Sequence, residues 1–81
     1  MRDEEARQAV RESIAEVAPE IDTGAINGSV PLQEQLDLDS LDFLSVMVAV
    51  YERTGVDIPE RDFPRVTTLD STVAYIVERA A

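Results

Sequence analysis

The 81-residue chain is predicted to fold as an all-α domain, a small bundle of four helices in which the third is short. In three separate stretches, apolar residues recur at steps of three and four, which is typical of helices with one buried face. No stretch of useful length alternates apolar and polar residues as a half-buried strand would. The length fits one domain over residues 1–81.

The first helix is expected over residues 3–18, with acidic residues in its first turn, where the helix dipole favours negative charge. Pro19 ends it. Residues 19–39 are rich in turn-forming residues and predict a long connection. The apolar stripe of the helix consists of Ala6, Val10, Ile14 and Val17, and we expect the connection to cover the core with Leu32, Leu36 and Leu38.

The second helix is expected over residues 40–54, with Asp39 or Ser40 as its N-cap and Gly55 as its C-terminal cap. A short third helix fits residues 60–65, because Pro64 leaves room for little more than a turn. The last helix follows the candidate caps Thr67 and Thr68. Its apolar stripe consists of Leu69, Val73, Ile76, Val77 and Ala80.

The second helix has more apolar surface than a helix at the edge of a bundle needs. At ~100° per residue, one apolar face consists of Phe43, Val46, Met47 and Val50, and the other, beside Ser40, of Leu41, Leu44, Val48 and Tyr51. Asp42, Ala49 and Arg53 are assigned to the back. Either the bundle buries this helix on two sides, or Leu41, Leu44 and Val48 face a partner or a cargo.

The composition excludes several classes of function. The chain has no Cys and no His, and therefore no disulfide, thiolate nucleophile, imidazole base or common zinc ligand. Its net charge of -10 argues against nucleic acids and anionic membranes and favours basic protein partners. It contains no apolar run of ~18 residues and no signal-peptide pattern. A cytoplasmic monomer is therefore expected.

Residues 36–42, LDLDSLD, place Ser40 among carboxylates at a helix start. A catalytic serine needs a base, and the chain has neither His nor Lys. A calcium-binding EF-hand loop started at Asp37 fails, because its required ligand, glycine and glutamate are replaced by Leu41, Asp42 and Val48. No metal site and no enzyme activity are predicted. Ser40 is then either a helix cap or a hydroxyl that another enzyme modifies, for which the helix start favours an attached phosphate group.

The order and spacing of three short motifs, Asp39-Ser40-Leu41, Ile58-Pro59 and Thr67-Thr68, resemble those of the acyl carrier protein family over about residues 3–80. The resemblance implies that Ser40 receives 4'-phosphopantetheine from coenzyme A. A separate Mg-dependent phosphopantetheinyl transferase would attach it. The chain would then hold acyl groups as thioesters on this arm, as a carrier and not as an enzyme.

The resemblance also implies that partner enzymes recognise acids along the second helix. Asp39, Asp42 and Glu52 match such positions, whereas Ser45 and Tyr51 stand where the family often has Glu. With Leu41, Leu44 and Val48, the three acids form the expected partner face. This pattern suggests a specialised freestanding carrier, with its own loading ligase or synthase and downstream acyl-processing enzymes.

The cargo and the class of carrier stay open. Fatty acid, polyketide or related biosynthesis fits the resemblance, and so does a small carrier for activated amino acids. Leu38 stands where peptidyl carriers usually have Gly, which favours the acyl branch. The alternative from another class is an unmodified acidic helical interaction domain, in which Ser40 is only a cap.

Overall fold

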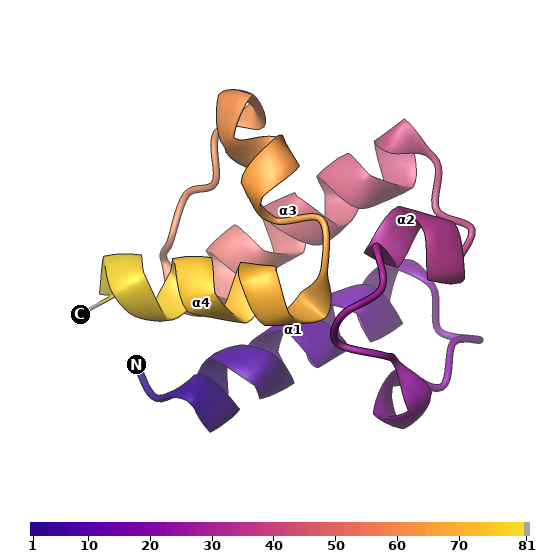
Figure 1. Cartoon of the computed structure of the whole chain (residues 1–81), viewed down its shortest axis with the longest axis horizontal. Coiled ribbons are helices and arrows are strands. Elements are labelled where there is room, and N and C mark those ends of the chain that lie inside the picture. Colours follow the sequence, from indigo (N-terminus) through magenta and orange to yellow (C-terminus); the bar gives the residue numbers. More distant parts are fainter. Residues whose placement is uncertain (81) are drawn as a thin grey trace.

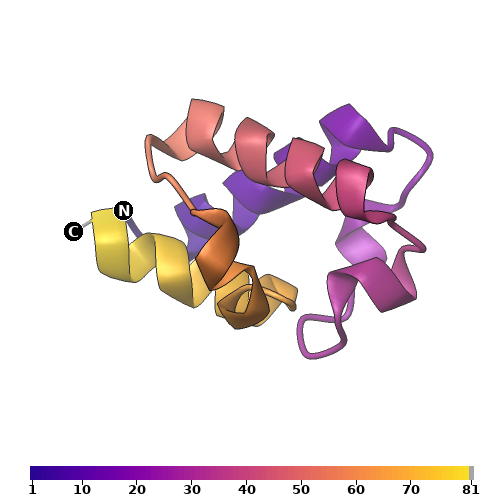
Figure 2. The ribbon, with the colours of Figure 1, turned by 90° about the horizontal axis from the view of Figure 1, so that it is seen from above.

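The computed structural model describes residues 1–80. The elements follow in the order α1 (Asp3–Val17), η1 (Thr23–Ala25), α2 (Leu32–Gln35), α3 (Ser40–Thr54), η2 (Glu60–Arg65) and α4 (Leu69–Ala80), where η denotes a 3-10 helix. Helix α1 packs against both α3 and α4 (Figure 1). The short η2 follows α3 and precedes α4 along the chain, and it lies over α4 (Figure 2). The predicted all-α fold, with three main helices and a short one before the last, is confirmed.

The connection between α1 and α3 contains structure that the sequence did not predict. A single turn of α-helix, α2, interrupts it at Leu32–Gln35. Such a helix is too short to show an apolar period, which explains why the pattern missed it. The expectation that the connection covers the core is confirmed, because Leu32 and Leu38 are buried and Leu36 packs against the core.

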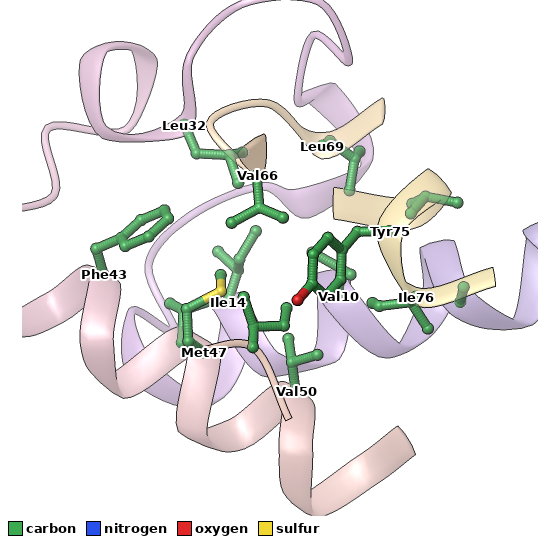
Figure 3. Packing of buried hydrophobic residues seen from close by; sticks show 14 of the residues in the cluster. Val10, Ile14, Leu32, Phe43, Met47, Val50, Val66, Leu69, Tyr75 and Ile76 are labelled. Carbon is green, nitrogen blue, oxygen red and sulfur yellow. The ribbon is translucent and has the colours of Figure 1, made fainter. Parts of the chain in front are cut away.

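The core lies where the inner faces of α1, α3 and α4 meet (Figure 3). Each predicted apolar stripe contributes fully buried side chains, and two more come from the connecting segments. Side chains without exposed surface include Val10, Ile14, Leu32, Val46, Val50, Val66, Val73 and Ile76. The stripes of α1 and α4 are therefore confirmed.

One side of α3 was assigned wrongly. The helical periodicity assigns Ala49, with Asp42 and Arg53, to the back of the helix, but only 1% of Ala49 is exposed. Helix α1 packs against α3. The guanidinium of Arg53 lies 3.8 Å from Glu12 Oε1 and 3.5 Å from Glu16 Oε2, both on α1. This side of α3 is therefore a contact between helices.

The start of α4 is capped by Thr68, one of the two predicted candidates. Its Oγ1 accepts a hydrogen bond from the Ser71 amide at 3.0 Å, and Ser71 Oγ accepts one from the Thr68 amide at 3.0 Å. This reciprocal pair satisfies two backbone donors at the helix start. Thr67 does not cap the helix. Its carbonyl oxygen accepts a hydrogen bond from the Leu32 amide at 2.7 Å, which connects α2 to this end of the bundle.

A polar contact joins η2 to α4. The buried Tyr75 donates its hydroxyl to Asp62 Oδ2 at 2.6 Å, and the Arg79 guanidinium lies 4.3 Å from the Tyr75 ring centroid and 3.8 Å from the same carboxylate oxygen. The hydrogen bond from Tyr75 holds the pKa of Asp62 below its usual value. Burial, and then the bond to Asp62, raises the pKa of Tyr75. The position of η2 is thus fixed by a specific contact with α4.

Candidate functional site

The turn before α3 fixes where Ser40 lies. Helix α2 ends at Gln35 with Leu36 as its C-cap, Asp37 adopts a left-handed conformation with φ 55°, and the Leu38 amide donates back to the Gln33 carbonyl at 3.1 Å. This bond and the left-handed residue form a Schellman-type helix end. Leu38 is then buried, which anchors the chain two residues before Ser40.

Asp39, and not Ser40, is the N-cap of α3. Its Oδ1 accepts a hydrogen bond from the Asp42 amide at 2.8 Å, and Ser40 is the first helical residue. Ser40 is exposed, and within residues 1–80 its hydroxyl has no hydrogen-bond partner. Of the two candidate caps, Asp39 therefore takes this role, and the Ser40 side chain is not needed for it.

The environment of Ser40 suits a modified hydroxyl better than a catalytic one. In the part of the chain that the structure describes, no group activates its oxygen as a base would. The amides of the first turn of this 15-residue helix carry the positive end of its dipole, which favours an attached phosphate. The hydroxyl can therefore attack a phosphate donor only when another enzyme supplies the base, and no group here makes it a catalytic nucleophile.

A cavity of about 430 Å³ opens beside Ser40, between α3 and η2. Its lining is mainly apolar and consists of Gln33, Ser40, Leu41, Phe43, Leu44, Glu60, Phe63, Pro64 and Thr67. A second hollow of about 250 Å³ shares Leu44, Glu60 and Phe63 with it and reaches Val48 and Tyr51 farther along α3. A surface depression therefore begins at Ser40, where its lining is mainly apolar, and follows the helix.

The second apolar face of α3 is open. Leu41, Leu44, Val48 and Tyr51 are 74, 45, 52 and 51% exposed, whereas Phe43, Val46, Met47 and Val50 are at most 4% exposed. The possibility that the bundle buries this second apolar face is therefore wrong. Of the three acids predicted to meet partners, Asp39 and Glu52 are exposed, and Asp42 is half-buried.

Two further properties bear on function. Among residues 1–80, no three acidic side chains converge as metal ligands would. No helix in this range is long and apolar enough to cross a membrane.

Comparison with known proteins agrees with this geometry. A family model described as "Phosphopantetheine attachment site" matches residues 8–76. The acyl carrier protein of Tropheryma whipplei (strain Twist) is 31% identical over 80 residues, which cover 94% of this chain and 96% of the relative. The acyl carrier protein of Rubrobacter xylanophilus is 27% identical over 75 residues, 89% of this chain and 93% of the relative. A mitochondrial acyl carrier protein of Dictyostelium discoideum is 37% identical over 43 residues, 53% of this chain and 36% of the relative.

The chain belongs to the acyl carrier protein family and contains its phosphopantetheine-binding domain. It is a carrier that bears phosphopantetheine and not a catalyst, which confirms the sequence-based predictions of family, cofactor and lack of enzyme activity. Membership also implies a phosphopantetheinyl transferase and acyl-processing enzymes as partners.

The residues around Ser40 fit this cofactor. The exposed hydroxyl can form the phosphoester, and the first turn of α3 offers amide dipoles to the phosphate. The adjoining cavity combines apolar side chains with the polar groups of Gln33 and Thr67, which suits an arm that contains both amides and aliphatic carbons. When attached, the cofactor supplies the thiol that this chain, without cysteine, does not have.

Proposed function

We propose that the chain carries acyl groups as thioesters on a 4'-phosphopantetheine arm attached to Ser40. The observation that carries the proposal is the exposed, unpartnered Ser40 hydroxyl at the first residue of α3, among the residues described. Because Asp39 already caps the helix, α3 does not need the serine side chain for its stability. The serine is thus available for modification without cost to the fold.

The outer face of α3 is proposed to dock the partner enzymes. Leu41, Leu44 and Val48 are exposed beside Ser40, and an apolar patch of this kind on a small domain marks an interaction site. The exposed carboxylates of Asp39 and Glu52 add negative charge, which would steer basic surfaces of partners toward it. Fatty acid, polyketide or related biosynthesis is the proposed setting, while the cytoplasmic location and the monomeric state stay predictions.

The attachment is tested by intact mass after incubation with coenzyme A, Mg²⁺ and a broad-specificity phosphopantetheinyl transferase. Wild type and Ser45→Ala should each gain one phosphopantetheine, and Ser40→Ala should gain none. Ser45 is a matched control because it is an exposed serine on the same helix. All three proteins should show the same helical circular dichroism.

A folded wild type that gains no mass, while the transferase modifies another carrier, would contradict the proposal. The exposed apolar face would then favour the alternative of an unmodified interaction domain, because that face needs a partner whether or not Ser40 is modified.

A further inference from the structure

The cavity beside Ser40 ends on two phenyl rings. Phe43 of α3 and Phe63 of η2 both line it, and their ring centroids lie 5.3 Å apart with the planes at 78°. This edge-to-face arrangement is a favoured geometry for aromatic pairs. Phe43 is only 4% exposed and belongs to the core cluster, and Phe63 packs against that cluster. The pair therefore forms the floor between the cavity and the core.

The core behind the floor is closely packed. Phe43 lies at the margin of the cluster beside Met47, with Leu32 and Val66 nearby (Figure 3). Leu32, Val46 and Val66 have no exposed surface. Because protein interiors are packed to the density of organic crystals, a chain cannot enter this region unless side chains or whole elements move.

The element that would have to move is η2, which carries Phe63. It is tied to α4 through the 2.6 Å hydrogen bond from Tyr75 to Asp62, and Arg65 and Arg79 both lie over the Tyr75 ring. The Val66 amide also donates to the Phe63 carbonyl at 3.0 Å, which closes the end of η2. Phe63 is thus held on the cavity side by its own element and by α4.

We propose that Phe43 and Phe63 determine cargo specificity: they stop the acyl group at the surface cavity, so that the carrier suits compact apolar acyl groups, short or ring-bearing, and does not draw a long chain into its core. The inference names the cargo class of the carrier proposed above and rests on that proposal. The mainly apolar lining around Leu41, Leu44 and Pro64 favours such a group over a polar one.

The test attaches alkyl chains to position 40 without any transferase. Ser40→Cys creates the sole thiol in the chain, because the sequence has no cysteine. The thiolate attacks the sulfenyl sulfur of an alkyl methanethiosulfonate, a mixed disulfide forms, and methanesulfinate leaves. Butyl and dodecyl reagents are compared in three backgrounds: Ser40→Cys alone, with Phe63→Ala, and with Val48→Ala, a control that removes an exposed apolar side chain of α3 outside this cavity. The readouts are the thermal midpoint and the methyl NMR signals of Val46 and Val66.

In the Ser40→Cys parent, dodecyl and butyl labels should give the same thermal midpoint and the same Val46 and Val66 methyl signals. With Phe63→Ala, the dodecyl chain should enter the vacated space, raise the midpoint above that of the butyl form and shift those methyl signals. The Val48→Ala background should behave like the parent. If Phe63→Ala does not fold, Phe63→Leu keeps the core apolar and should show the same effect to a smaller extent.

A dodecyl chain that raises the midpoint and shifts the core methyls in the parent would overturn the inference. So would a Phe63→Ala protein that folds and shows no dependence on chain length. Neither result bears on whether Ser40 accepts phosphopantetheine, because the label is attached chemically and the mass test addresses attachment separately.

Discussion

Asp39 has two predicted roles, as the N-cap of α3 and as an acid that partner enzymes recognise, and two substitutions separate them. Asp39→Ala removes both the acceptor for the Asp42 amide and the charge. Asp39→Asn keeps an oxygen that can accept the same hydrogen bond and removes only the charge, since Asn and Asp cap helices about equally well.

The expected free-energy changes follow from these differences. Loss of an N-cap costs about 1 kcal/mol on average. Loss of one exposed charge at a helix N-terminus costs about 0.3–1 kcal/mol at low salt. Asp39→Ala should therefore lower the free energy of unfolding by about 1.3–2 kcal/mol, the sum of the two contributions, and Asp39→Asn by only that of the charge. High salt should remove the deficit of Asp39→Asn and leave most of that of Asp39→Ala.

Urea unfolding followed by circular dichroism measures the stability part, and the kcat/KM of phosphopantetheine transfer measures recognition. Both variants should be modified more slowly than wild type, because both lack the charge. Glu78→Gln, which removes an exposed acid on α4, is the control for net charge. Equal destabilisation of the two Asp39 variants would refute the cap assignment, and a wild-type transfer rate in Asp39→Asn would refute recognition of the charge.

Three further predictions concern the outer face, the η2 contact and the turn before α3. Val48→Glu should change the free energy of unfolding by less than about 0.5 kcal/mol. Val46→Glu should lower it by several kcal/mol, because it buries an unpaired charge. If urea unfolding shows that the two variants lose similar stability, Val48 belongs to the core. The lowered pKa of Asp62 implies stability that is present above its unfolded value near 3.8 and is lost as the pH falls through its folded value. Tyr75→Phe should therefore flatten the fall in thermal midpoint below that pH, and an unchanged acid profile would contradict this assignment. Asp37→Ala should cost about 1 kcal/mol in urea unfolding because of its left-handed backbone, while Asp37→Gly should not; equal effects would argue against strain there.

The main helices could be predicted because their signals are local. The stripes of α1 and α4 and the inner face of α3 are periodic over several turns, so the pattern identifies the buried side without any knowledge of the neighbours. Ala49 shows the limit of prediction from periodicity alone. Alanine is compatible with both a buried and an exposed position, and only the packing of α1 against α3 decides between them.

The site was predictable in part for the same reason. The Asp39-Ser40 pair is a helix start in any arrangement, but the sequence cannot say which oxygen takes the amide, since both residue types are good caps. The contact between Asp62 and Tyr75 joins residues 13 apart on separate elements and was not foreseen. The pairing of Phe43 with Phe63 likewise depends on how η2 lies against α3, which no period in the sequence encodes.

The two faces of α3 place different demands on its sequence. The inner face can change only at a cost in stability, because its side chains are at most 4% exposed and closely packed. The outer face, with Leu41 74% exposed, is nearly free of that demand and can change with the partner. Phe43 meets both kinds of demand, because it is buried in the core and also lines the cavity beside Ser40. A substitution at Phe43 would therefore alter stability and cargo fit together, whereas one at Val48, which is exposed and does not line this cavity, would alter only what docks.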